Sequence, residues 1–494
     1  MSTAVLHGSA RAAARTGAHA MAQPTAPAAR QGYLVAIAVL APLCVPAGPG
    51  QSAVLDFVNL IVLASAAFLL LVPGVRVRVP FLAPAALIAV GSLLALWQAP
   101  SLKLGALALA QDVYLFAWFV LVVNLLRDET DIRVLMAAWT ATAVAVALCA
   151  LVQVVLHDGS LVGFLGSRGF RPAGTLYNPN MLADYLVTSL FISAAALSGR
   201  GWMLRAFTGT VLLAGLLATK SNGGMAALAA GALVWVVVRA VTRRVPLQAM
   251  AAAALLALSL AGLGAWVNGE WGVGNAVLAS FRQHTFAGRL EHSSESRLRI
   301  WDQLQHSYAR SPLGIGPGNS GAITLGIADR ERPDSWKSKE AHSDYLAYAI
   351  ERGPLGVIGL LWWTCAGFAA VAAWARRAGA VRRGTAGRSA THGNPRAHDP
   401  GAWTAAMAGL LAASALHSTV IEKLHFRHFW LVLAMVSASA LLPARRTQSA
   451  AAPAETRTPA QPGGRSGLVP RTVITGATVA GVAVAVASLD QVCA

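Results

Sequence analysis

The sequence predicts an all-α polytopic membrane protein of about twelve transmembrane helices, with one large periplasmic helical loop between the ninth and tenth spans. Only 12% of the 494 residues are charged, against about 25% in soluble globular chains, whereas 56% are hydrophobic. The apolar residues form long runs, and a helix needs roughly 20 such residues to cross a bilayer. Because these runs lack the alternation of strands, helices rather than a barrel are expected to satisfy the backbone in lipid.

Twelve apolar runs account for the expected spans. They are residues 33–47, 52–72, 80–97, 103–126, 132–156, 181–198, 202–219, 223–240, 247–267, 353–375, 402–421 and 427–442. A further run, 472–489, is less apolar and is not counted. The chain then divides into a disordered basic cytoplasmic arm (1–32), spans one to nine (33–267), the loop (268–352), spans ten to twelve (353–442) and a cytoplasmic tail (443–494) with that weak apolar run.

The distribution of charge predicts which side of the membrane each connection faces. With the N-terminus inside, nearly all of the net charge of +18 falls in the arm, the tail and the connections that follow even-numbered spans. This is the positive-inside pattern of a multi-pass membrane protein, whose basic segments are expected to contact anionic membrane lipid. The same pattern explains the pI without a nucleic-acid partner.

The loop at 268–352 is the longest connection, and it should lie on the periplasmic side because nine spans precede it. In "SESRLRIWDQLQHSYARS" apolar residues recur at helical spacing, which predicts a helix that lies on the membrane or the bundle. A turn, "SPLGIGPGN" (311–319), follows. A second helix is expected over 340–353, with one face formed by His342, Tyr345, Leu346 and Ala349.

Cations are unusually frequent on the predicted outer side, where connections should be poor in them. Arg168 and Arg171 occur in the connection 157–180, which ends in the helix start Asn178-Pro179-Asn180, and Lys220 lies between spans seven and eight. Clustered Arg and Lys at a membrane surface suit phosphate or pyrophosphate. The sequence has no Walker motif and no Asp-x-Asp pair in the outer segments, which disfavours ATP- or metal-dependent sugar transfer.

Three segments resemble the O-antigen ligase and polymerase superfamily: "RPAGTLYNPNMLADYL", "SRLRIWDQLQHSYARSPLGIGPGN" and "AHSDYLAYAIERGPLGVIGLLWW". The resemblance covers roughly residues 160–375. In this chain Ser343 stands where the family usually has Asn, and Ser221-Asn222-Gly223 stands where it often has Ser-Arg-Gly. The resemblance implies glycan transfer from undecaprenyl pyrophosphate to an acceptor hydroxyl, with neither a metal nor another cofactor.

That chemistry assigns roles to particular residues. His342 is the expected catalytic base, because a neutral imidazole can take the proton of the acceptor hydroxyl. The cations expected to bind the pyrophosphate are Arg171, Lys220, Arg289 and Arg297. Secondary candidates are Arg168, Asn180, Tyr345 and Glu351, and for Glu351 the first expectation is that it orients the loop or pairs with an arginine. Direct displacement would invert the anomeric centre.

Several readings stay open at this point. A ligase that attaches O-antigen to lipid A–core is favoured, while an O-antigen polymerase, a protein O-oligosaccharyltransferase and, more distantly, a transporter of an anionic solute are alternatives. His417, His425 and His428 could form a metal trio, but Lys423 and Arg427 crowd the same turn, so no metal site is expected. Asp112, near the middle of a span, is expected to make a structural hydrogen bond.

Overall fold

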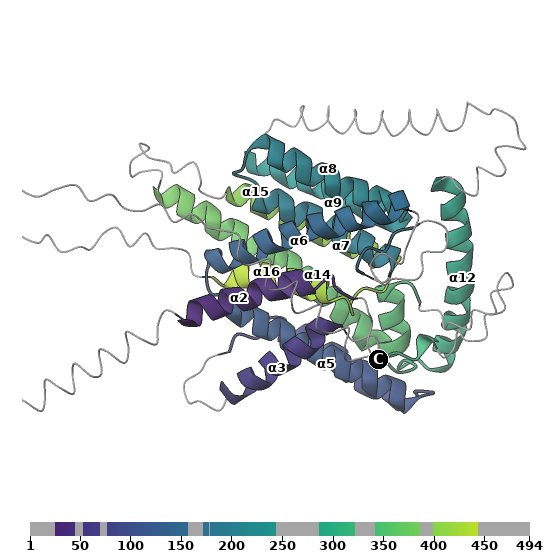
Figure 1. Ribbon diagram of the computed structural model, residues 1–494. Coiled ribbons are helices and arrows are strands. Elements are labelled where there is room, and N and C mark those ends of the chain that lie inside the picture. Colours follow the sequence, from purple (N-terminus) through teal and green to yellow (C-terminus); the bar gives the residue numbers. More distant parts are fainter. Residues whose placement is uncertain are drawn as a thin grey trace, which may run out of the picture. The chain divides into compact units, whose positions relative to one another are not determined.

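The computed structural model describes residues 25–44, 53–69, 77–156, 171–176, 178–243, 286–321, 341–385 and 399–442, and their regular structure is helical (Figure 1). The helices are α2 (Thr25–Leu40), α3 (Val54–Leu69), α4 (Leu82–Leu96), α5 (Leu102–Leu125), α6 (Glu129–Leu156), α7 (Pro179–Ala196), α8 (Trp202–Ala218), α9 (Asn222–Arg243), α12 (Phe286–Arg310), α14 (Asp344–Thr385), α15 (Pro400–His417) and α16 (Arg427–Leu441). The predicted all-α class is confirmed for this part of the chain.

The apolar helices agree with a multi-pass membrane protein. Four are long and apolar enough to cross a bilayer, at Leu102–Leu125, Glu129–Leu156, Asn222–Thr242 and Asp344–Gly379, judged by length and composition. Shorter apolar helices cover Ala28–Leu40, Val54–Ala67, Leu82–Leu96, Trp202–Ala218 and Arg427–Leu441. The expected span at 247–267, most of the basic arm and the whole tail lie outside the described residues. The total of twelve spans therefore stays a prediction.

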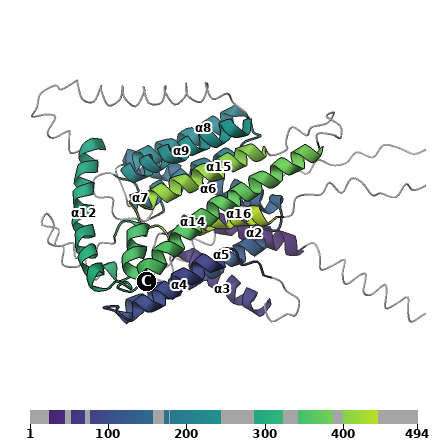
Figure 2. The ribbon, with the colours of Figure 1, turned by 180° about the vertical axis from the view of Figure 1, so that it is seen from behind.

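Small residues allow the central helices to approach closely. Helix α15 packs against α9, α7 and α14, and α14 runs along α4 (Figure 2). A Cβ built on Gly231 of α9 would lie 2.5 Å from the backbone oxygen of Gly409 in α15, and one built on Gly409 would lie 2.7 Å from the oxygen of Gly231. Any larger side chain would separate the two helices, as is typical of small-residue contacts between membrane helices.

Two sets of contacts mark the opposite ends of this bundle. At one end Arg239 of α9 pairs with Asp399, which caps α15, at 2.6 Å. The other end of the same two helices is formed by Ser221 and His417. The connections agree: Arg30 pairs with Asp131 at 3.1 Å, joining two residues assigned to the inner side, and the amide of Ser101 donates to Asn319 at 3.0 Å, joining two assigned to the outer side.

The segment between the ninth and tenth expected spans packs on the bundle through α12. Leu304 is fully buried and Ile300 nearly so, in a cluster with Ile315, Ala341, Ala347 and Ile350, while Trp301 and Tyr308 pack on its edge. The amphipathic face predicted for this helix therefore contacts protein. Leu298, which was expected on the same face, is instead 59% exposed.

The expected helix around His342 differs from the observed one. Helix α14 begins at Asp344, is broken at Gly353, where φ is 65°, and then continues into the tenth expected span. His342 thus precedes the helix instead of lying on its face. The reason is local: Ser343 Oγ accepts the amide of Leu346 at 3.4 Å as an N-cap, and His342 has φ 53°, outside the helical range.

Candidate functional site

A pocket of about 260 Å³ lies where α7, α9, α12 and the end of α15 meet. Its wall contains three of the four cationic side chains that the sequence singled out, Arg171, Lys220 and Arg297, although they come from three separate elements. The remaining lining residues are Asn180, Ser221, Asn222, Gly223, Ala226, Leu416, His417, Thr419, Val420 and Ile421. The pocket therefore gathers positive charge from positions as far apart in sequence as 171 and 297.

Arg171 is held in place by acceptors on its neighbours. Its Nε donates to the backbone oxygen of Thr219 at 2.9 Å, and its Nη2 donates to Asn180 Oδ1 at 2.9 Å. The hydroxyl of Ser221 donates to the same Asn180 oxygen at 3.1 Å. These bonds fix the plane of the guanidinium, so that it can meet an anion with little loss of side-chain freedom.

The start of α9 also opens on the pocket. Ser221 Oγ accepts the amide of Gly224 at 3.3 Å and so caps the helix. Lys220, one residue earlier, has φ 52° and an exposed side chain. The start of α7, where Asn178 accepts the amide of Asn180 at 2.8 Å, confirms the predicted Asn-Pro-Asn helix start. Two helix N-termini thus add their partial positive charge to that of the side chains.

The remaining predicted cations are placed less completely. Arg297 is half-buried on α12, and this burial lowers the pKa of its guanidinium. The side chain still stays charged, because the pKa of an arginine starts far above neutral pH. Arg289 lies about two turns earlier on α12, and its side chain is not among the parts that the structure describes. Arg168 also lies outside the described residues.

His342 is half-buried and lies outside the lining of the cationic pocket. Its backbone amide donates to Glu422 Oε1 at 3.0 Å, which ties the segment before α14 to the connection between α15 and α16. That connection also supplies Ile421 to the pocket wall. His342 is therefore joined to the pocket wall only through Glu422, the neighbour of Ile421 in sequence.

Tyr345 and Glu351 have positions that differ from those of the cations. The hydroxyl of Tyr345 donates to the backbone oxygen of Ala415 at 3.1 Å, beside a small apolar cavity. Glu351 accepts the amides of Gly318 at 2.8 Å and Ser320 at 3.2 Å, and it pairs with Arg352 at 3.3 Å. This is the geometry of a residue that orients the 311–319 turn.

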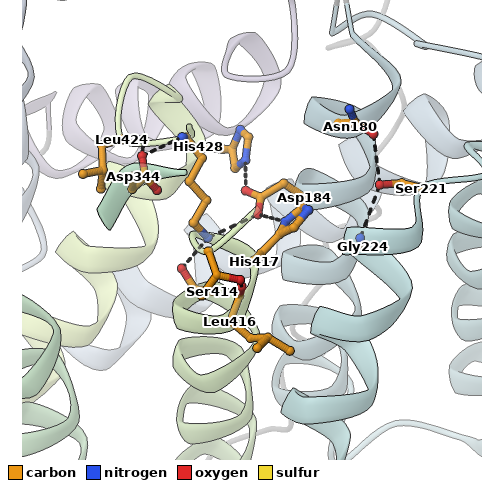
Figure 3. A network of polar contacts seen from close by, with 12 residues as sticks. Asn180, Asp184, Ser221, Gly224, Asp344, Ser414, Leu416, His417, Leu424 and His428 are labelled. Carbon is orange, nitrogen blue, oxygen red and sulfur yellow. Dashed lines mark hydrogen bonds and ion pairs between the residues drawn. The ribbon is translucent and has the colours of Figure 1, made fainter. Parts of the chain in front are cut away.

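A second polar cluster, which the sequence did not predict, lies behind the pocket (Figure 3). Asp184 of α7 is 3% exposed and receives His417 Nδ1 at 2.7 Å, His428 Nε2 at 2.9 Å and Lys423 Nζ at 3.2 Å. Lys423 Nζ also donates to Ser414 Oγ at 2.5 Å. An acid inside an apolar helix was the signal that could have found it, because such residues are functional candidates by default.

The three histidines considered as a metal trio therefore do not share one set of contacts. His417 and His428 share the carboxylate of Asp184 with an ammonium group. His425 packs edge-on against Phe426, and burial, with the nearby charges of Arg427 and His428, lowers its pKa to about 4.

Asp112 is bound by a cation that no local sequence window could reveal. Arg352, at the other end of 240 residues of chain, donates to its Oδ2 at 2.5 Å. The expected structural bond is thus an ion pair between α5 and α14.

Comparison with known proteins adds one match. Residues 207–361 match the model of a protein family described as O-antigen ligase. This range contains Lys220, Arg297, His342 and Glu351, while Arg171, Asp184 and His417 lie outside it. No curated protein matches the chain.

Proposed function

We propose, from the match of residues 207–361 to a family described as O-antigen ligase, that the protein is a periplasmic-face glycosyltransferase of lipopolysaccharide biosynthesis. It moves an O-antigen glycan from undecaprenyl pyrophosphate to a sugar hydroxyl of lipid A–core. The alternatives within the same chemistry are an O-antigen polymerase and a protein O-oligosaccharyltransferase.

The observation that carries this proposal is the convergence of Arg171, Lys220 and Arg297 on one pocket. A pyrophosphate diester carries two negative charges, and fixed cations with two helix N-termini match them. A volume of about 260 Å³ suits the pyrophosphate and part of the first sugar, while the polyprenyl chain stays in lipid.

The transfer itself needs no metal in this proposal. The acceptor oxygen attacks the anomeric carbon, and the bond between that carbon and the phosphate oxygen breaks, with its electron pair going to the pyrophosphate. His342 accepts the proton of the acceptor hydroxyl. The cations stabilise the charge that develops on the leaving group. A single displacement of this kind inverts the anomeric centre.

The arrangement of the helix ends supports a periplasmic site in a twelve-span protein of the inner membrane. Helices α9 and α15 have Arg239 and Asp399 at one end and the pocket at the other. The Arg239 end carries the arginine-rich connections, which positive-inside sorting assigns to the cytoplasm. The pocket then opens on the periplasmic face.

Deletion of the gene in its bacterium tests the proposal, with gel analysis of lipopolysaccharide and of the lipid-linked glycan pool. A ligase deletion should leave unsubstituted lipid A–core and accumulate long lipid-linked glycan. Single repeats on lipid A–core would indicate a polymerase, and loss of protein-bound glycan would indicate an oligosaccharyltransferase. If lipopolysaccharide, lipid-linked pool and protein glycans all stayed unchanged, the proposed function would be wrong.

A further inference from the structure

His417 belongs both to the pocket and to the buried cluster around Asp184. Its ring is almost fully buried, yet it lines the pocket, and its Nδ1 lies 2.7 Å from Asp184 Oδ1. Because a carboxylate beside Lys423 is ionised, Nδ1 carries the hydrogen and donates it. This leaves Nε2 as the nitrogen available to the pocket.

The other edge of the ring faces the start of α9. A Cβ built on Gly223, which also lines the pocket, would lie 3.3 Å from Nε2 of His417. Among the described residues Nε2 has no hydrogen-bond partner, and it is not sealed from solvent as Nδ1 of His428 is. A ligand in the pocket can therefore reach this nitrogen.

The surrounding charges decide when the ring carries a second proton. Asp184 and the C-terminus of α15, which ends at His417, both favour an imidazolium. Lys423, which donates to the same Asp184 oxygen as His417, and the three pocket cations oppose it. His428 bonds the other oxygen of the same carboxylate, Asp184 Oδ2, at 2.9 Å. An anion that neutralises the pocket cations would shift this balance toward protonation.

We propose that His417 is a pyrophosphate ligand that takes up a proton when the glycan donor binds. The inference rests on the proposed function, because it requires that the pocket holds a pyrophosphate. Bound in this way, Nε2–H donates to a phosphate oxygen while Asp184 holds Nδ1–H. As the glycosidic bond breaks, its electron pair passes to the phosphate oxygen, and this donor stabilises the added charge.

The chain offers a matched control for the test. His417 and His428 are equally buried and bind the same carboxylate, but His417 lines the pocket and His428 does not. The purified full-length protein is titrated with a short polyprenyl pyrophosphoryl hexose, a diester that does not itself titrate near neutral pH. Calorimetry is run from pH 5.5 to 8 in buffers of different ionisation enthalpy, which reports proton uptake.

Wild type should take up a proton on binding, and its affinity should therefore fall as the pH rises. His417→Gln should bind about tenfold or more weakly at low pH and lose this pH dependence, because a charge-assisted bond is lost. His428→Gln should keep the pH dependence. Thermal unfolding of each variant reports whether the fold is retained.

The outcomes separate the two proposals. If wild type binds the probe without proton uptake, if His417→Gln keeps the wild-type pH dependence, or if both glutamine variants lose it, the role of His417 is wrong. An Arg171→Ala arm tests the pocket itself. Failure of wild type to bind, or undiminished binding by Arg171→Ala, would contradict the proposed function and the inference with it.

Discussion

Two residues of the candidate site hold backbone conformations that side chains rarely adopt. The non-glycine residues with positive φ in the described part of the chain are Phe81, Lys220 and His342. Such a conformation costs of order 1–2 kcal/mol and persists only where the surroundings enforce it. Lys220 and His342 are also residues that the sequence singled out for chemistry. Each lies in the connection before a helix, so its side chain points in a direction that a position within the helix would not allow.

Removing one pocket cation should reduce transfer without affecting insertion. Arg171→Ala, Lys220→Ala and Arg297→Ala should each lower turnover by about 10²–10³-fold, because each removes a fixed donor at the leaving group. Arg171→Lys should recover little, since a point charge cannot replace a guanidinium that bonds Thr219 and Asn180 at once. Transfer from lipid-linked donor to acceptor is measured with purified enzyme.

Arg205→Ala is the control for these variants, because Arg205 is an exposed arginine on α8, at the end away from the pocket. It should transfer at the wild-type rate. Near-normal turnover in all three pocket variants, at normal expression, would exclude the pyrophosphate site.

His342→Ala should abolish transfer while donor binding is retained. A base must be unprotonated, so turnover should fall as the pH drops through the imidazole range. The proposed role of His417 has the opposite sign, because it must be protonated, and binding should weaken as the pH rises. Together the two roles predict that kcat/KM of the wild type follows a bell-shaped dependence on pH. His417→Gln should remove the fall at alkaline pH, whereas His342→Ala should show no measurable transfer at any pH.

The readout is turnover and donor binding of the same purified variant across pH 5–8. His342→Ala with most of its turnover would remove His342 as the base. Loss of donor binding in that variant would instead make it a phosphate ligand. A chelator should change neither quantity.

Sequence reasoning found the pocket cations but missed their support. Arg171, Lys220 and Arg297 were detectable because positive charge is unexpected on the outer side. Asp184 could have been noticed as an acid inside an apolar helix, but its pairing with Lys423 could not, since the two residues are 239 positions apart. Pairings of this kind depend on which helices pack together, and a reading of one segment at a time contains no such information.

At the scale of elements, the 311–319 turn and the kink of α14 require each other. A Cβ on Gly314 would lie 2.7 Å from the backbone oxygen of Glu351, and one on Gly353 would lie 2.5 Å from that of Leu313. Both glycines have positive φ, at 105° and 65°. The sequence indicated a turn and a helix here, but this contact between them could not be predicted from it.

Gly353→Ala should therefore destabilise the protein by more than about 1–2 kcal/mol, the cost of the backbone conformation alone, because the new methyl group also clashes with Leu313. Thermal unfolding in detergent measures it. Gly379→Ala on the same helix, where nothing lies within 4 Å, should be neutral or slightly stabilising. Equal unfolding temperatures for both variants would mean that the turn does not depend on this kink.

At the scale of the whole molecule, acids inside apolar helices are matched with cations that arrive from distant parts of the chain. Asp56 pairs with Arg427, Asp112 with Arg352, and Asp184 with Lys423. An unpaired charge inside a bilayer is costly, so these pairs restrict which helices can be neighbours. Composition and run length predicted the class and most helix positions, whereas the arrangement of the bundle depends on these long-range pairs.

The topology makes a prediction that helix α14 allows to be tested directly. Beyond its kink, residues 354–379 form a helix of roughly 39 Å, longer than the roughly 30 Å hydrocarbon core. Its ends should therefore lie on opposite sides of the membrane. Positive-inside sorting assigns the arginine-rich end to the cytoplasm, and the end that begins at Asp344 then belongs with the pocket on the periplasmic side.

Reporter fusions within 380–395 and within 325–335 should give opposite results, with the first cytoplasmic and the second periplasmic. Alkaline phosphatase, active only outside, and a fluorescent protein that matures only inside provide complementary signals at each site. A fusion at 200–201, the connection between α7 and α8, should report the cytoplasm as 380–395 does. If the reporters at 380–395 and 325–335 lay on the same side, the twelve-span arrangement would be rejected, because α14 would then not cross the membrane between them.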